Sequence, residues 1–387
     1  MTSARDLVRP ARWLLVSAAS VNLAAGAVIA RRDPARAGDL WTIYDWCRAW
    51  LSGARLYTMA EAATDYPPNA IVLLSPLAQV PRAWLVPLWT AGSLILAPVL
   101  AWCVIRCAAR GDRGALAVPV LLFLCWTSAR TLLQFSALSM TLAFASLLIV
   151  DSHQLASGLL LGLALFKPHI AGPIALWAAL TGRLRVLLMA FVVAAAGWAV
   201  YDAHIGEWPQ TTFGGYWHVL GEQYAGREGL TGMTSIRAWT HAAAGTTAAA
   251  DAWWIGLSVL LLIGIAGLAW RDRRRALDEG GLALPALLCL WSLLTVYHHI
   301  NNLILMLPAF AFLWYRDDRG ARPIRWLPLV LMQAVLMVDV PTRLAWLAPH
   351  DGWLSSVIGD VDRLVVVSVF LCVAAAWYQL TRRPIAG

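Results

Sequence analysis

Charged residues are scarce in this chain, and lysine is nearly absent. Only 13% of the 387 residues are charged, whereas an ordinary soluble domain carries about 25%. Lys167 is the single lysine, so arginine supplies almost all of the positive charge. Hydrophobic residues make up 60% of the chain and recur in apolar runs along its length. This composition excludes an ordinary soluble protein and predicts an all-α, polytopic integral membrane protein.

Patterns typical of metal sites and disulfide frameworks are also missing. Five of the six cysteines lie in apolar runs, Cys47 lies in a loop, and neither HExxH nor CxxC occurs. We therefore expect no metal and no other cofactor. The net charge of +8 comes from arginines between apolar runs, as the positive-inside rule describes, so nucleic acid is not an expected partner.

The alternation of apolar runs and arginine-bearing loops predicts about twelve transmembrane helices in one domain, residues 1–387. Some of these helices are short or broken, since twelve residues cover roughly 18 Å and the hydrocarbon core is about 30 Å thick. Arginines before the first run place the N-terminus in the cytoplasm, and an even number of spans returns the C-terminus there. The expected location is the plasma membrane. The predicted spans are 13–30, 84–105, 116–127, 136–150, 155–166, 170–180, 186–204, 252–270, 282–296, 303–314, 324–340 and 364–380.

Residues 31–82 form the first predicted extracytoplasmic loop, which differs from the rest of the chain in its acids, arginines and tyrosines. The stretch 41–51 predicts an amphipathic helix in the membrane interface. Its proposed apolar face consists of Trp41, Tyr44, Cys47 and Leu51. Residues 71–78 are apolar but too short to cross, and we expect a partly embedded helix there.

Asp39, at the start of this loop, is the candidate general base. A carboxylate close to the membrane is expected to be partly desolvated, and desolvation makes it a stronger base. One base suffices for an inverting sugar transfer, because no covalent intermediate is needed. The alternative is a solvated loop acid. Asp45 is the rival base, although we interpret it as a surface acid, and Asp65 is expected to cap the following helix.

Lys167 lies in the motif FKPH, at a break between two short apolar runs. A lone lysine in this position is costly unless it faces water or an anion. We expect it either to contact a lipid-linked phosphate or to reach the membrane interface as a snorkelling side chain.

Further polar residues collect on the predicted outer side. His298 and His299 are adjacent and so point in two directions, which makes them a poor metal clamp; one of them could donate a hydrogen bond to a leaving phosphate. Arg130 and Gln134 are one helical turn apart and could face the same cavity. The second predicted outer loop, 205–251, contains Arg227 beside Glu228. That pair either binds phosphate or acceptor or forms a salt bridge within the loop.

Several short motifs occur in an order that resembles glycosyltransferase family 87 of the GT-C superfamily. They are DLWTIY at 39–44, GARLY at 53–57, DYPP at 65–68, the region from Gln134 to Lys167-Pro168, and the turn at 297–299. The resemblance implies a GT-C-like fold and transfer of a sugar, expected to be mannose, from a polyprenyl-phosphate donor. The acceptor would be a lipid-linked sugar or glycan at the outer face. The second outer loop departs from the family pattern.

The same resemblance implies roles for individual residues. Asp39 would be the general base, and Lys167 with one of His298 and His299 would bind phosphate or acceptor. The substrate-binding candidates are Tyr44, Tyr57, Tyr66, Arg130, Gln134, Lys167, Arg227, His298 and His299. Membrane lipids are the remaining expected partners.

Two other kinds of function are compatible with a polytopic membrane protein. A transporter or lipid flippase would show charges near mid-membrane and internal repeats, and neither is evident. A lipid-linked polymer ligase would show a large, arginine-rich late loop, whereas the loop 205–251 has only two arginines. These features favour the transferase.

Overall fold

The computed structural model describes helices and connecting segments in two compact units. One unit comprises 24–100 and 128–228, and the other comprises 1–23, 101–127 and 229–387. No strand occurs among the described residues, which confirms the all-α prediction for that part of the chain. The described residues are 28, 38–57, 64–108, 134–225, 235–245, 248–271, 282–296, 298, 300–317 and 353–381.

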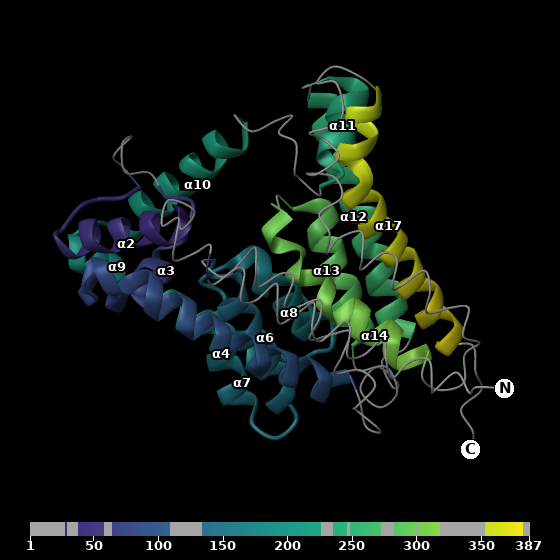
Figure 1. Ribbon diagram of the computed structural model, residues 1–387, viewed down its shortest axis with the longest axis horizontal. Helices are drawn as coiled ribbons and strands as arrows, with labels where there is room; N and C mark the ends of the chain where they lie inside the picture. Colours follow the sequence, from purple (N-terminus) through teal and green to yellow (C-terminus); the bar gives the residue numbers. More distant parts are fainter. Residues whose placement is uncertain are drawn as a thin grey trace. The chain divides into compact units, whose positions relative to one another are not determined.

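The unit around residues 38–225 combines the long helix α9 and most of α4 with several shorter helices (Figure 1). Helix α6 packs on α7, α7 packs on α9, and α8 contacts all three; α3 also packs on α9, and α2 lies on α3 and η2. The bounds are α2 Gly38–Leu51, α3 Pro68–Leu74, η2 Ser75–Gln79, α4 Arg82–Ala108, α6 Ser136–Ile149, α7 Gln154–Ala164, α8 Pro168–Leu180, α9 Leu184–Ile205 and α10 Pro209–Ala225.

Small residues let α7 approach α9 closely. A Cβ atom added to Gly162 would lie 2.8 Å from the Ala190 carbonyl oxygen and 2.6 Å from the Val193 Cβ. Hydroxyl groups join α6 to α7 in the same region, where the Ser146 and Ser157 Oγ atoms are 2.8 Å apart. Small side chains and hydroxyl pairs are typical of helix contacts in membranes, where close backbone approach replaces the hydrophobic driving force.

Helix α2 is amphipathic as predicted, but its buried face is rotated from the predicted one. Tyr44 and Cys47 are buried, whereas Leu51 is 37% exposed. The buried stripe at 40, 43, 44, 47 and 50 follows the helical repeat more closely than the predicted set. This stripe packs on α3, η2 and α9 residues of the protein itself, because the neighbouring helices supply an apolar surface.

The second unit is built around α13 (Ala283–Thr295), in which every residue except Trp291 is buried. Helices on several sides bury it, since α12, α14, η3 and α17 all contact it. The bounds of the surrounding elements are α11 Arg237–Ala244, α12 Ala248–Arg271, η3 Ile300–Met306, α14 Leu307–Asp317 and α17 Trp353–Thr381.

Three described helices are long and apolar enough to cross a membrane: Arg82–Ala108, Leu184–Ile205 and Ala248–Trp270. Shorter apolar helices at 136–149, 154–164, 168–180, 283–295, 302–313 and 364–378 coincide with six further predicted runs. The predicted spans 116–127 and 324–340, and the span 13–30 apart from residue 28, lie outside the described residues, so the number twelve stays a prediction. The predicted loop 205–251 contains two helices, α10 and α11.

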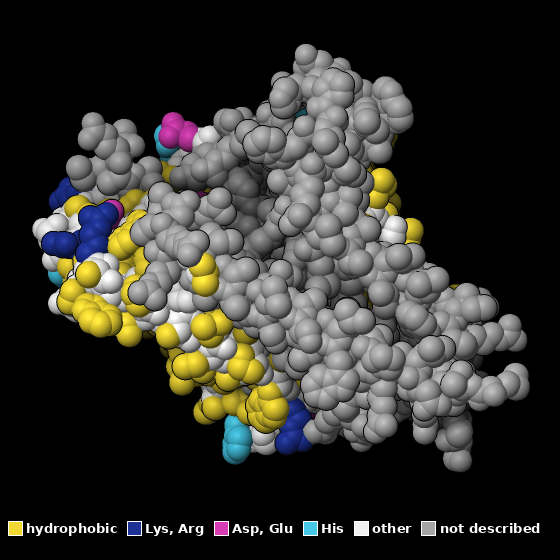
Figure 2. All heavy atoms as spheres, viewed as in Figure 1, with side chains coloured by type: hydrophobic (Ala, Val, Ile, Leu, Met, Phe, Trp, Pro, Cys, Tyr) yellow, Lys and Arg dark blue, Asp and Glu magenta, His cyan; other side chains and the backbone are white. Residues whose placement is uncertain are grey.

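The exposed surface of the first unit is mostly apolar along α4 (Figure 2). Trp84, Leu88 and Ile95, all on this helix, are more than half exposed. Water would disfavour such a surface, and lipid would accept it. The exposure of α4 therefore supports its assignment as a membrane span.

Candidate functional site

The single lysine lies in the interior of the first unit. Lys167 is the N-cap residue of α8, directly after α7, and only 4% of it is exposed. Its Nζ lies 5.5 Å from the centre of the Tyr66 ring. Burial lowers the pKa of Lys167 to about 8, while the carboxylates of Asp39 and Asp65 oppose that shift. The aromatic face and the two carboxylates partly compensate the buried ammonium group, and this ammonium is the group of the cluster that an anionic ligand could contact.

Asp39 and Asp65 come to this lysine from different parts of the first loop. Asp39 lies in the first turn of α2, and Asp65 lies just before α3. Both carboxylates interact electrostatically with Lys167 and with the phenol of Tyr66. The structure therefore brings three residues of the predicted site, Asp39, Tyr66 and Lys167, into one neighbourhood, and it adds Asp65.

Asp39 is exposed on the protein's own surface, and its closeness to the membrane stays a prediction. The expectation for Asp65 is wrong. Asp65 does not cap α3, because the N-cap residue is Pro67 and no side chain makes a capping hydrogen bond. Pro68 has no N–H to offer, and its fixed φ already favours the first turn. Asp65 instead acts electrostatically on Lys167, an interaction that the sequence did not predict.

The segment that carries Tyr66 is fixed by hydrogen bonds and ring contacts. The Tyr57 hydroxyl donates to the Tyr66 carbonyl oxygen at 2.6 Å, and the Tyr66 N–H donates to the Thr64 hydroxyl at 3.1 Å. The Tyr66 ring contacts Trp46 and Phe135. Burial, together with Asp39 and Asp65, raises the pKa of Tyr66 well above its usual value. Tyr66 therefore remains a neutral phenol at physiological pH.

The other predicted residues of this unit have different positions. Tyr44 donates its hydroxyl to the Val80 carbonyl oxygen at 3.2 Å, and so links α2 to the end of η2. Tyr57 likewise uses its hydroxyl to fix the loop. Gln134 directly precedes Phe135, whose ring contacts Tyr66, so the chain brings Gln134 near the lysine site. Arg130 and Arg227 lie outside the described residues.

Asp45 is a surface acid, as predicted. Its carboxylate lies 3.8 Å from the Arg82 guanidinium, and both side chains are more than half exposed. Exposed ion pairs of this kind contribute about 0–1 kcal/mol. Asp45 is therefore well suited as a control position for Asp39.

The second unit contains a separate polar cluster at the start of α12. Arg237 Nε and His241 Nε2 lie 3.0 Å and 2.9 Å from the same Asp251 oxygen. The Arg237 guanidinium lies over the Trp254 ring, 5.2 Å from its centre. The sequence did not predict this cluster, because Arg237 and Asp251 belong to different helices and their contact depends on how those helices pack.

His298 lies in the interior of the same unit. It is fully buried, and its Nε2 lies 3.0 Å from the Ser292 Oγ on α13. This contact holds the ring against the last turn of the central helix. His299 lies outside the described residues. No three His, Cys, Asp or Glu side chains of the described chain come together as metal ligands.

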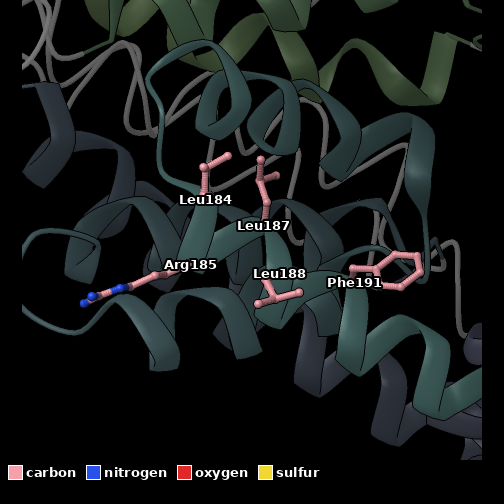
Figure 3. Close-up of a pocket in the computed structure, with 5 residues that line it drawn as sticks. All are labelled: Leu184, Arg185, Leu187, Leu188 and Phe191. Carbon is pink, nitrogen blue, oxygen red and sulfur yellow. The ribbon is translucent and has the colours of Figure 1, made fainter.

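An apolar pocket is found elsewhere, on the first turns of α9 (Figure 3). Its lining consists of Leu184, Arg185, Leu187, Leu188 and Phe191. Arg185 extends away from the four apolar side chains (Figure 3). Leu184, Leu188 and Phe191 are largely exposed on a candidate membrane span. The pocket is therefore part of the apolar outer surface and offers no chemistry of its own.

The sequence model of glycosyltransferase family 87 matches residues 64–296, more than half of the chain. The chain belongs to glycosyltransferase family 87. It is therefore a membrane glycosyltransferase. No curated protein and no solved structure matches the chain.

The family match covers some of the site residues and leaves others outside. Asp65, Tyr66, Gln134 and Lys167 lie within it, whereas Asp39 precedes it and His298 follows it. The membership confirms the expected family and the glycosyltransferase class. The residue roles still depend on the geometry described above.

Proposed function

We propose that this family 87 glycosyltransferase transfers a sugar, with mannose as the first candidate, from a polyprenyl-phosphate donor to a lipid-linked or glycan acceptor. The reaction would take place at the outer face of the plasma membrane, with both termini in the cytoplasm. The observation that carries the proposal is the burial of Lys167. Its ammonium group lies over the Tyr66 ring and interacts electrostatically with the carboxylates of Asp39 and Asp65.

Lys167 is proposed to bind the donor phosphate. Removing an ammonium group from water is costly unless an anion or a polar network compensates for the lost hydration. The Tyr66 ring and the more distant carboxylates supply part of this compensation. A phosphate would supply the rest, and a membrane-embedded donor could deliver it between the short helices α7 and α8. No bound metal is required for this contact.

Asp39 is proposed as the general base. The acceptor hydroxyl gives its proton to the carboxylate, and the acceptor oxygen forms a new bond to C1 of the sugar. The bond between C1 and the phosphate oxygen breaks, and polyprenyl phosphate departs with the bonding electrons. Attack from the face opposite the leaving group inverts the configuration at C1. The exposure of Asp39 supports this role, because an incoming acceptor can reach it.

Asp65 is the alternative base, since it shares the same neighbours. Asp65 is partly buried, and Asp39 is exposed. We assign Asp65 to the electrostatic positioning of Lys167 and Tyr66 and leave the proton transfer to Asp39.

The test uses membranes that contain the protein, a radiolabelled polyprenyl-phosphomannose donor and a lipid extract as acceptor. Wild type is compared with Asp39→Asn, Asp65→Asn and the control Asp45→Asn. A general base contributes about 10²- to 10⁴-fold to rate, so Asp39→Asn should lose that factor while Asp45→Asn stays near wild type. Full activity of Asp39→Asn combined with loss in Asp65→Asn would move the base to Asp65. If wild type uses nucleotide sugars instead, the polyprenyl-phosphate donor is wrong.

A further inference from the structure

Helix α10 has three distinct faces. The buried face contains Thr212, Tyr216 and Val219. A polar, exposed face contains His218 and Glu222, whose side chains lie 3.7 Å apart and are both more than 70% exposed. Between these two faces runs a stripe of exposed aromatic side chains, which an ordinary water-facing helix would not carry.

This aromatic stripe consists of Phe213 and Trp217, and Trp208 just before α10 adds a third exposed ring. Their exposed fractions are 53%, 56% and 78%, respectively. Phe213 and Trp217 are one turn apart, and their rings are in contact with centres 6.0 Å apart. Aromatic residues are enriched where a protein meets the membrane–water boundary, because their rings prefer the headgroup region.

The stripe continues the apolar surface of a candidate membrane span. Helix α9 ends at Ile205, shortly before α10 begins. The Trp198 ring on α9 lies 5.9 Å from the Phe213 ring, which joins the two surfaces. Along α9, Leu188, Phe191 and Val200 are more than half exposed. An exposed apolar face of this length is accommodated by lipid.

We propose that α10 is an interfacial helix, and that its aromatic stripe inserts into the headgroup region of the bilayer. The partner is therefore the lipid surface itself. The stripe lies beside the end of a span, and the adjacent polar face carries His218 and Glu222, which remain in water. Amphipathic helices bind membranes in this orientation, with the apolar side in the lipid boundary and the charged side outward.

The buried face of α10 packs against Tyr57, which is hydrogen-bonded to Tyr66 beside Lys167. Gly215 approaches the Tyr57 backbone so closely that an added Cβ would lie 2.6 Å from the Tyr57 carbonyl oxygen. The Tyr216 and Tyr57 rings are in edge contact at 5.8 Å, and Tyr57 in turn fixes Tyr66. If the proposed function holds, α10 thus keeps Tyr66 and Lys167 at a constant depth relative to the donor phosphate.

The test is photocrosslinking in lipid nanodiscs. Tryptophan fluorescence is unsuitable, because the chain has 22 tryptophans and the signal of one ring could not be separated from the others. The photoreactive residue p-benzoylphenylalanine is placed at Phe213 or Trp217, and at His218 or Glu222 as polar-face controls. Phe191 on α9 is the lipid-facing control. Intact-mass analysis after irradiation measures lipid adducts. We expect yields at 213 and 217 close to that at 191 and several times those at 218 and 222.

Equal yields at 217 and 218, or crosslinks from 213 and 217 to a second copy of the chain, would overturn the proposal. A second measurement applies if the photoreactive variants do not fold. Trp217→Cys and His218→Cys are labelled with a water-soluble maleimide in proteoliposomes, with the parent protein as background. Position 218 should label quickly, and 217 only after denaturation. Equal labelling rates would also refute membrane insertion. Neither readout needs catalysis, so failure here leaves the proposed function standing.

Discussion

The ammonium nitrogen of Lys167 lies 5.5 Å from the centre of the Tyr66 ring, in the interior of a unit whose outer surface is largely apolar. A cation over an aromatic face gains electrostatic attraction, and the gain grows when water is excluded. Asp39 and Asp65 act on both partners. This pair therefore links the only lysine of the chain to the loop that holds the two candidate acids.

Lys167→Met should lower kcat/KM for the lipid-phosphate donor by about 10- to 100-fold, because a hydrogen bond to a charged group is worth about 1.5–3 kcal/mol. Lys167→Arg should retain part of the activity, since the charge remains while the geometry changes. The measurement is initial rate against donor concentration. Arg82→Met, which removes an exposed cation of the same unit, is the control. Unchanged kcat/KM in Lys167→Met would rule out the phosphate contact.

The pH profile of kcat/KM should fall as pH rises through about 8. Burial lowers the pKa of Lys167 to about 8, so the free enzyme loses its ammonium charge above that value, and kcat/KM reports the free enzyme. An ordinary lysine would keep its charge until about 10.4. In Lys167→Arg the fall should vanish from this range, because guanidinium remains protonated. A wild-type profile that stays flat from pH 7 to 10 contradicts this assignment.

Adjacent glycines of α10 should respond differently to substitution. Gly215→Ala places a Cβ 2.6 Å from the Tyr57 carbonyl oxygen, whereas Gly214→Ala meets no atom within 4 Å. Overpacking costs about 1–3 kcal/mol, and relief of glycine flexibility in a helix gains about 0.5–1 kcal/mol. Thermal unfolding in detergent should therefore show a lower midpoint for Gly215→Ala only. Equal midpoints would show that α10 can move away from Tyr57 at little cost.

Neighbouring threonines offer a second matched pair. Thr212 is buried and donates its hydroxyl to the Asp202 Oδ1 at 2.5 Å, while Thr211 is exposed. Asp202 is itself buried, so Thr212→Val leaves its carboxylate without that donor, which costs about 1–3 kcal/mol. Thr211→Val should be nearly neutral. The same unfolding measurement compares the two variants, and a neutral Thr212→Val would mean that water replaces the lost donor.

The helices of the first unit could be predicted closely. The runs 136–150, 155–166, 170–180 and 186–204 coincide with α6, α7, α8 and α9 within a few residues. Long apolar runs with Gly, Pro and Arg at their ends leave few other structures, because the backbone must satisfy its own hydrogen bonds in lipid. The loop 205–251 was less predictable, since α10 mixes Gly, Trp and Tyr without a simple apolar period.

The sequence by itself determined that this is an all-helical membrane glycosyltransferase and that its lone lysine lies at a break between two short helices. Those conclusions rest on local composition, hydrophobic runs and ordered motifs. Only the tertiary structure decided that Asp65 acts on Lys167 and does not cap α3, and that Leu51 lies outside the buried face of α2. The reason is that residues 65 and 167 are distant along the chain, and their proximity depends on how α2, α3 and α6–α9 pack together.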